Sequence, residues 1–342
     1  MNMLQRTWAK KRRYADAALY WSGAAWAFEK LMQPTGAVIL MYHSVANDEV
    51  AQYIDPPNHL PSTEFERQIA FLSRERNVMS LNELVAQLEA GKEPCAGTVC
   101  ITFDDGYVDN LTVAAPILEK YKLPATLYLP TAYIDRGETH WADTIHQLFR
   151  FRAHDQLTMP SLGFSADLSE DAQRKLAYKK LHLSLLTSIY PYRQALLAEV
   201  REQLRPHQEG PRLTMNWDEV RDLRLRFPLF AVGGHSQSHL DLSAHGGQYA
   251  RIEIEGCKSN IQKELSVEPQ HFSFPYARWS METRSLVEQC GWKSAVGDGL
   301  GVRIGVKSNR FVLPRLPTPV SMTDLKFKTS GSFPGVYAWI GR

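Results

Sequence analysis

The chain has 342 residues, of which 44% are hydrophobic and 22% are charged. This is the composition of an ordinary globular protein, with enough length for one large core or two smaller ones. The formal net charge is only +2, so the overall charge gives no support to a nucleic-acid partner. The four cysteines lack paired C-x-x-C spacing. We interpret them as structural thiols, with a bridge or a metal role as the alternative.

The N-terminal segment, residues 1–35, is basic and aromatic. The basic residues 10–13 precede AALYWSGAAWAF, a run of only twelve residues that is too short to span a bilayer. On a helix, one face would carry Tyr14, Ala18, Trp21, Ala25 and Phe28, which suits an anionic membrane surface. We therefore expect residues 1–33 either to contact a membrane peripherally or to pack on their own domain. A cytoplasmic or inner-membrane-peripheral location is favoured over export, although Ala25-Trp26-Ala27 mimics a signal cleavage site.

From residue 36 to residue 342 we expect a single domain of parallel α/β type, because short apolar runs alternate with segments of helical period. The number of such runs favours a barrel over an open sheet. The predicted strands are residues 37–42, 98–103, 125–130, 229–233, 271–275, 293–296 and 311–315. The long gap between the third and fourth runs holds three stretches of helical period, so residues 134–213 are predicted to be a largely helical insertion.

Helix starts and stops can also be predicted locally. Thr63 with Glu66, and Ser80 with Glu83, match the capping box, in which two side chains satisfy free backbone N–H groups at a helix start. The glycines at positions 91 and 291 stand where a left-handed helix stop is expected.

Ionisable residues gather where the predicted strands end. His43 follows the first strand, Asp104 and Asp105 follow the second, and His235 follows the fourth. In parallel α/β barrels, the carboxyl ends of the strands converge on one mouth. His235 and His239 are four residues apart, so one helical turn or a tight loop could present both to a cation. Each pattern alone is weak, because Asp-Asp-Gly is usually a turn or helix cap and two histidines usually lie at the surface.

In combination, the segments ITFDDGYVDN, GGHSQSH and FSFPYARW resemble the first three sequence motifs of the polysaccharide deacetylases with a NodB-homology domain. Further segments such as ILMYHSV and FVLPRLP follow in the family's order, so the resemblance covers most of residues 37–317. It implies a deformed (β/α)7 barrel, here with a helical insertion. It also implies a hydrolase that removes N-acetyl groups from N-acetylhexosamine units of a bacterial-type surface polysaccharide or a lipid-linked precursor.

The resemblance also assigns the site. Asp105, His235 and His239 would hold one divalent metal ion, zinc or alternatively cobalt or nickel, and Asp104 would be the general base. Two adjacent carboxylates in a partly desolvated pocket repel each other unless a cation neutralises one of them. A bound metal ion lowers the pKa of its water from 15.7 to about 7, which leaves a proton for a nearby carboxylate. Three protein ligands leave positions open for water and an amide carbonyl.

The sequence departs from the best-known family pattern in two places. Ser273 stands where many members have an arginine, and no histidine follows His271, so the late general acid is missing. Both departures resemble the exopolysaccharide deacetylases, whose members carry an early Tyr-His pair like residues 42–43. We expect His43 to be the general acid or a substrate-positioning donor, with orientation of the base as the alternative. Arg315 would replace the missing positive charge or be a structural arginine.

The remaining predicted site residues concern a glycan substrate. A backbone N–H near Tyr107 would help to hold the oxyanion, and Pro275 and Tyr276 would shape one wall of the groove. Trp141, near the start of the insertion, would lie closest to the mouth, which gives the insertion a role in substrate selection or only in support of the barrel. Two other functions stay open: deacylation of another small amide or ester, and a catalytically silent glycan-binding domain.

Overall fold

The computed structural model describes residues 31, 34–297 and 303–331, so the expected membrane contact of residues 1–33 falls almost wholly outside the described part. Within that part no helix combines the length and the apolar character needed to cross a membrane. The described residues include all four cysteines, and each is a free thiol.

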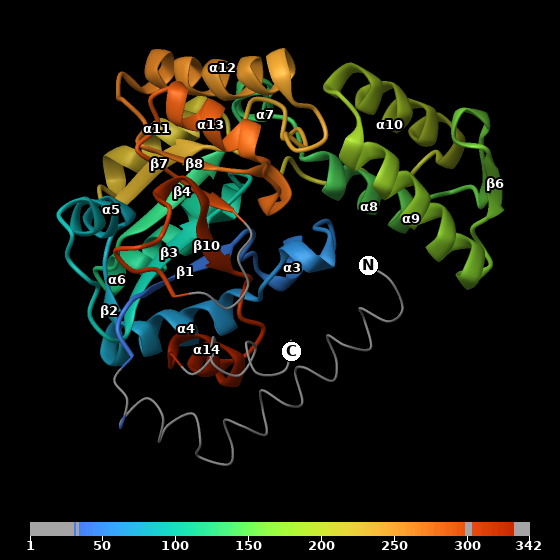
Figure 1. Cartoon of the computed structure of the whole chain (residues 1–342). Coiled ribbons are helices and arrows are strands. Elements are labelled where there is room, and N and C mark those ends of the chain that lie inside the picture. Colours follow the sequence, from blue (N-terminus) through green and yellow to red (C-terminus); the bar gives the residue numbers. More distant parts are fainter. Residues whose placement is uncertain (1–30, 32–33, 298–302, 332–342) are drawn as a thin grey trace.

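Seven parallel strands close into a barrel, as predicted (Figure 1). In order around the ring they are β1 (Ala37–Tyr42), β10 (Leu313–Leu316), β9 (Ser294–Gly297), β8 (His271–Ser273), β7 (Phe230–Gly234), β4 (Ala125–Leu129) and β3 (Thr98–Phe103), which returns to β1. All seven predicted strands are present. A further short strand, β2 (Asn77–Val78), was not predicted and pairs with β3 outside the ring.

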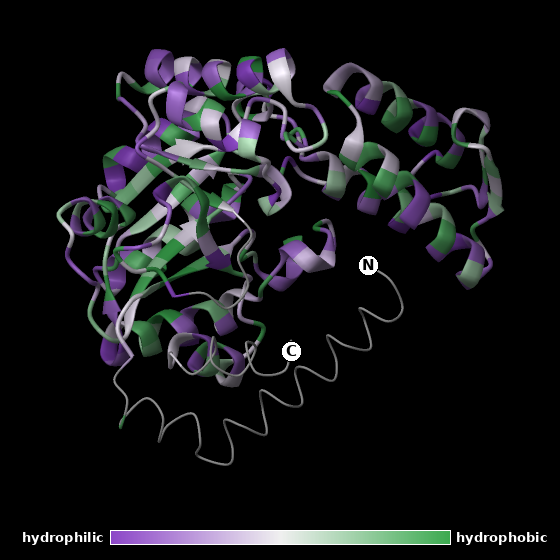
Figure 2. Ribbon diagram, in the orientation of Figure 1, coloured by the Kyte–Doolittle hydropathy of each residue, from purple (hydrophilic) through white to green (hydrophobic). Residues whose placement is uncertain are grey.

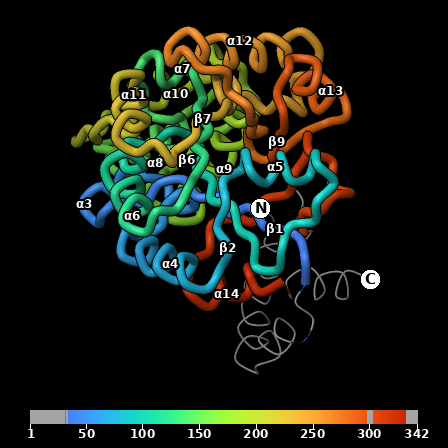
Figure 3. The backbone as a smooth tube through the Cα atoms, turned by 90° about the vertical axis from the view of Figure 1, so that its left-hand side faces the viewer, coloured from blue at the N-terminus to red at the C-terminus, as the bar shows by residue number. Residues whose placement is uncertain are grey.

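Helices surround the strands, as Figure 3 shows from the side. The outer layer contains α4 (Ser62–Glu75), α6 (Ala115–Lys120), α11 (Trp217–Arg226), α12 (Gly247–Leu265) and α13 (Met281–Gln289). Shorter helical elements are α3 (Asp48–Ala51), η1 (Pro56–Asn58), η2 (Asn110–Ala114), α7 (Thr131–Arg136), η4 (Pro275–Ala277), η5 (Arg310–Val312) and α14 (Met322–Thr329). One further helix, α5 (Leu81–Glu89), packs against residues from the inside of the barrel.

The alternation of side chains between the two faces of the strands determines where the candidate site lies. One set of strand residues, including Leu40 and Phe103, packs in the core shared with the outer helices, and the other set, including Ile39 and Cys100, packs with α5. Because strand side chains alternate between faces, the second set faces the barrel interior. His43 continues this inward set beyond β1, as Asp104 does beyond β3. Both side chains therefore lie at the carboxyl end of the barrel, on its inner face.

The insertion stands to one side of the barrel and has its own hydrophobic core (Figure 1). Its helices are α8 (Trp141–Arg150), α9 (Asp171–Thr187) and α10 (Tyr190–Leu204), and each carries both hydrophobic and hydrophilic residues (Figure 2). The expectation of a largely helical insertion missed a small antiparallel hairpin, β5 (Gln156–Met159) and β6 (Phe164–Asp167), joined by the turn η3 (Pro160–Leu162).

The helix starts and stops predicted from local sequence are confirmed where the residues involved contact only each other. Ser80 and Glu83 form the predicted capping box of α5, and the glycines after α5 and α13 have positive φ. The predicted box at Thr63 is wrong, because α4 already begins at Ser62 and has no side-chain cap. There the N–H of Ser62 donates to the carbonyl of Ala46 at 3.3 Å, so a contact distant in sequence satisfies one of the free N–H groups of this helix start.

A buried carboxyl group, Asp143 of α8, joins the insertion to the barrel. It accepts the backbone N–H of Asp55 at 2.7 Å and the hydroxyl of Tyr107 at 2.8 Å. Tyr178 of α9 donates to the carboxylate of Asp55 at 3.2 Å. Burial raises the pKa of Asp143 to about 8 and that of Asp55 to about 6, because these hydrogen bonds only partly offset the loss of water. The junction is therefore most stable when Asp143 carries a proton.

This raised pKa predicts a pH-dependent stability. A carboxyl group whose pKa is higher in the folded protein favours folding at low pH, and that advantage is lost as the pH rises from 3.8 toward about 8. Asp143→Asn has no charge to develop, so its free energy of unfolding should fall less over this range in urea titrations. The control is Asp218→Asn, whose wild-type side chain is 88% exposed. If wild type and Asp143→Asn show the same pH slope, Asp143 is ionised in the folded protein.

Candidate metal centre

Strained turns present the candidate ligands. Directly after β3, Asp105 has φ 70° and Gly106 has φ 66°, and a Cβ on Gly106 would come within 2.9 Å of side-chain atoms of Ile134 and Leu129. Only glycine satisfies both conditions at this position. His239 also has a positive φ, 53°, which is unusual for a residue with a side chain. Such strain concentrates at functional sites, where the surrounding structure enforces it.

Asp104 is held by an arginine from the last strand of the barrel. The two nitrogens Nη1 and Nη2 of Arg315 donate to the two carboxylate oxygens at 2.7 and 2.6 Å. Nη2 also donates to the hydroxyl of Ser273 at 2.8 Å. Burial alone would raise the pKa of Asp104, but Arg315 lowers it below the ordinary value of 3.8, with smaller contributions from His235 and His43. Asp104 is therefore an ionised carboxylate in a fixed orientation.

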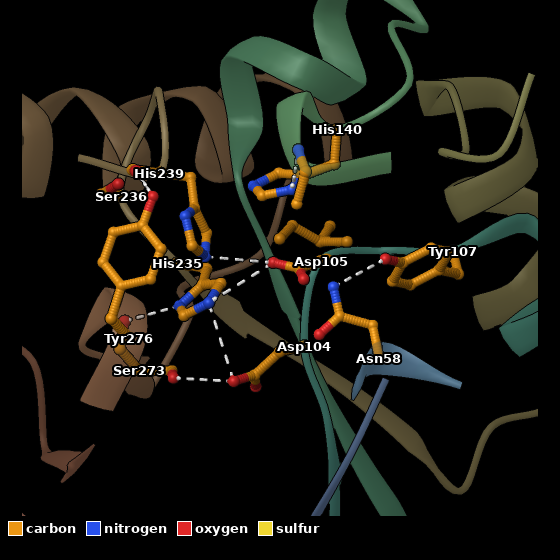
Figure 4. A network of polar contacts seen from close by, with 12 residues as sticks. Asn58, Asp104, Asp105, Tyr107, His140, His235, Ser236, His239, Ser273 and Tyr276 are labelled. Atoms are coloured by element: carbon orange, nitrogen blue, oxygen red, sulfur yellow. Dashed lines mark hydrogen bonds and ion pairs between the residues drawn. The ribbon is translucent and has the colours of Figure 1, made fainter. Parts of the chain in front are cut away.

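Asp105 faces the two histidines instead (Figure 4). Its Oδ1 lies 3.2 Å from Nε2 of His239 and 3.6 Å from Nε2 of His235. Asp104 and Asp105 are only 2% and 3% exposed, and over the described ranges Oδ1 of Asp105 accepts no hydrogen bond. An ionised oxygen in such surroundings needs a positive partner.

The imidazoles cannot supply all of that positive charge. Burial alone would raise the pKa of Asp105, but protonated His140 and His239 beside it would lower it well below 3.8. Burial also lowers the pKa of His235 to about 4 and that of His140 well below 6.5. These two rings are therefore neutral near pH 7. A divalent cation among Asp105 and the neutral rings fits the donor set, because imidazole and carboxylate are zinc ligands.

Ring hydrogen bonds show which histidines can bind the cation. Nδ1 of His235 donates to the carbonyl of Ser273 at 2.8 Å, which leaves the lone pair of Nε2 toward the carboxylates. Asp105, His140 and His239 also bring ligand atoms within 4.8 Å of one another. However, Nδ1 of His140 accepts the N–H of Ala142 at 3.4 Å, so its Nε2 carries the proton. The ring hydrogen bonds therefore favour His235 over His140 as a ligand beside Asp105 and His239.

The loop from His235 to His239 is fixed on two sides. The carboxylate of Glu253 on α12 accepts the backbone N–H groups of Gln237 and Ser238, both at 2.8 Å. From the insertion, the buried Arg193 donates to the carbonyl of Ser238 at 2.8 Å. The insertion thus helps to fix the geometry of the candidate ligands.

A cavity of about 410 Å³ opens at this centre, a size typical of small-ligand sites. Of the predicted site residues it is lined by His43, Asp104, Asp105, Trp141, His235, His239 and Tyr276. Three predicted substrate-binding residues are absent from its lining. The Tyr107 hydroxyl turns to Asp143, Arg315 binds Asp104, and Pro275 begins η4. The side chains of Tyr107 and Arg315 are therefore committed to protein partners.

His43 lies beside Asp104, because β1 and β3 are neighbours in the ring. In the observed register Tyr42 of β1 pairs with Phe103 of β3, so the next residue of each strand is His43 and Asp104. The His43 carbonyl accepts the side-chain N–H of Asn110 at 2.8 Å. Its ring nitrogen Nδ1 is buried without a hydrogen bond to any residue that the structure describes.

Several site residues were not found from the sequence. His140, Asp55 and His182 line the cavity, and Arg193 holds the ligand loop. Of these residues, His140 comes closest to being predictable from the sequence, because it directly precedes Trp141 at the start of a stretch of helical period. No short motif marks the other three.

The chain matches known families over part of its length. Residues 91–159 and 198–295 match the polysaccharide deacetylase family model, and the break falls in the insertion. Over 104 residues, 30% of the chain, it is 34% identical to the putative polysaccharide deacetylase YxkH of Bacillus subtilis, covering 35% of that protein. Over 106 residues, 31% of the chain, it is 31% identical to a poly-beta-1,6-N-acetyl-D-glucosamine N-deacetylase of Staphylococcus aureus, covering 34% of it. The matches thus span about a third of each of these relatives.

Solved structures share the fold across most of the chain. The Streptococcus pyogenes deacetylase PplD aligns with a TM-score of 0.57 and 16% identity, over 87% of this chain and 98% of its own. IcaB from Ammonifex degensii aligns with a TM-score of 0.54 and 16% identity, over 91% of this chain and 99% of its own. Identity this low supports the fold alone. The family model and the sequence relatives, with the motifs after β3, β7 and β8, show that the chain belongs to the polysaccharide deacetylase family.

Proposed function

We propose that the protein is a metal-dependent hydrolase that removes N-acetyl groups from N-acetylhexosamine units of a bacterial-type surface polysaccharide or its lipid-linked precursor. One observation carries this proposal: adjacent buried carboxylates have different partners, Arg315 for Asp104 and histidines for Asp105. A glycan-binding domain without activity has no need of this division. The family's sequence relatives, which include the Staphylococcus aureus enzyme named above, support the same reaction.

In this proposal Asp105, His235 and His239 hold one divalent ion, zinc or alternatively cobalt or nickel. When bound there, the ion would polarise the acyl carbonyl and acidify a water molecule. Asp104 accepts the proton of the attacking water. Each carboxylate oxygen has two lone pairs, so the bidentate contact with Arg315 leaves capacity for that proton. Arg315 keeps Asp104 ionised and fixes its orientation, although the lowered pKa makes Asp104 a weaker base.

His43 is the proposed donor to the departing sugar nitrogen. The amine must gain a proton as its bond to the acyl carbon breaks, and a positioned imidazole suits that transfer near neutral pH. His235 and His239 are assigned to the metal ion, whereas His43 faces the same cavity next to Asp104.

The cavity wall supports a sugar as the substrate. Trp141 and Tyr276 line it, and the indole N–H of Trp141 donates to the Tyr276 hydroxyl at 3.0 Å. His182 packs against Trp141 with ring centroids 5.0 Å apart. Polar groups such as Asp55 and Asn58 complete the lining. Aromatic faces with nearby hydrogen-bonding groups match the apolar faces and hydroxyl edges of a pyranose.

The ligand assignment predicts that metal binding and catalysis separate by mutation. His235→Ala or His239→Ala should abolish tight binding of one zinc ion per chain, because two protein ligands are too few to hold it. Asp104→Asn should retain the ion and lose roughly 10²- to 10⁴-fold in kcat, the usual contribution of a general base. Zinc content and acetate release from N-acetylated oligosaccharides measure both effects. Equal loss of zinc in all three variants would refute the role of Asp104.

The role of His43 predicts a dependence on the leaving group. A sugar amine must be protonated to depart, whereas 4-nitrophenolate departs unaided. His43→Gln should therefore lose roughly 10²- to 10⁴-fold in kcat on an N-acetylated oligosaccharide and keep most of its activity on 4-nitrophenyl acetate, with zinc content unchanged. Equal losses on the two substrates would instead indicate that His43 orients Asp104 or the substrate.

The substrate itself requires a direct screen. Purified protein with zinc, cobalt or nickel should be incubated with short N-acetylated glycans, lipid-linked sugars and simple amides or esters. Mass spectrometry then measures the masses of the products. Loss of an acetyl group from one glycan class identifies the substrate. Metal binding without any acetyl loss would favour a binding role.

A further inference from the structure

His140 is a cavity residue without a role in the reaction proposed above. It is 2% exposed and stands at the N-cap of α8, the first helix of the insertion. Its ring is nearly perpendicular to that of His239, with 4.5 Å between the ring centroids. Figure 4 shows it above Asp105, on the side away from Asp104. A residue of the insertion therefore borders the candidate metal centre.

The helix cap fixes which ring nitrogen of His140 can donate. Nδ1 accepts the backbone N–H of Ala142, so the proton of the neutral ring is on Nε2. This Nε2 is buried and finds no acceptor in residues 34–297 and 303–331. Buried N–H groups are nearly always hydrogen-bonded, so the acceptor of this donor is to be sought in a bound molecule.

The position of His140 indicates what that molecule presents. A ring nitrogen of His140 lies within 4.8 Å of ligand atoms of Asp105 and His239, and the residue lines the cavity. The acyl group of a substrate must enter this space to meet the candidate ligands. Its carbonyl oxygen is an acceptor, and it gains negative charge when water adds to the carbon.

We propose that Nε2–H of His140 donates a hydrogen bond to the acyl oxygen of the substrate. This hydrogen bond strengthens as that oxygen becomes an oxyanion. The inference rests on the proposed function, to which it adds a catalytic residue supplied by the insertion. The proton stays on Nε2 throughout, so His140 acts by stabilising charge and not by transferring a proton.

The surrounding contacts hold this donor in place. The next residue, Trp141, donates to Tyr276 at 3.0 Å, and Asp143 accepts the N–H of Asp55 and the Tyr107 hydroxyl. The start of α8 is thereby tied to η4 and to the chain before α4. A donor fixed before the substrate binds needs no reorganisation during the reaction, which is the condition for effective charge stabilisation.

The decisive variant is His140→Asn. Asparagine is among the best N-cap residues, so it preserves the start of α8, but its shorter side chain does not reach the acyl oxygen. We expect kcat on an N-acetylated oligosaccharide to fall roughly 10²- to 10³-fold, the usual loss for one oxyanion donor, while KM, zinc content and Tm stay near wild type. The methylphosphonamidate analogue of glucosamine, a tetrahedral mimic, should bind more weakly by a similar factor.

The matched control is His146→Asn, which makes the same replacement on α8 where the wild-type ring contacts the Gln52 carbonyl at 3.1 Å. It should leave kcat and analogue binding unchanged. Wild-type kcat and analogue affinity in His140→Asn would overturn the inference and leave His140 as a helix cap alone. Loss of zinc affinity with a changed visible spectrum of the cobalt-loaded protein would overturn it in favour of a metal ligand. A wild-type protein that neither binds zinc nor releases acetate would refute the proposed function as well.

Discussion

The candidate site at the carboxyl end of this barrel depends on one electrostatic constraint: two adjacent carboxylates are buried together and need different countercharges. Asp104 is paired with Arg315, a permanently charged side chain. Asp105 faces the imidazoles of His235 and His239, and burial lowers the pKa of His235 to about 4, so a metal ion is the proposed partner for this carboxylate. Without that division the carboxylates would repel each other or one would take up a proton. The proposed chemistry uses the same division, with an ionised base beside a cation site.

The parts of the site that belong to the barrel could be predicted from the sequence, because strand alternation and strand ends determine them. Asp104, Asp105 and His235 each follow an apolar run, and parallel strands bring such ends together. The same reasoning put His43 at this mouth, and the register of β1 and β3 places it beside Asp104. Arg315 was open between a functional and a structural role, and the structure shows it bound to Asp104.

The contribution of the insertion could not be predicted, because it depends on how two cores pack together. Arg193 reaches the ligand loop from α10, and Tyr178 reaches Asp55 from α9. Neither contact has a sequence pattern, since the partners are distant in the chain and helical period identifies only a helix. The capping box at Thr63 is also wrong, because α4 begins at Ser62, whose N–H donates to the distant carbonyl of Ala46. Local signals were reliable at α5, where the cap residues are each other's partners.

The closed ring also has a consequence for how the chain folds after its synthesis begins. Arg315 lies 211 residues after Asp104 and is carried by β10, which enters the ring between β9 and β1. On a ribosome, Asp104 is synthesised long before its partner, and until β10 docks, the carboxylate must stay hydrated or protonated. Docking of β10 would then close the ring and bring Arg315 to Asp104 at the same time. A chain in which β10 has not yet docked lacks the arginine that orients Asp104, so the gain of activity during refolding would report closure of the ring.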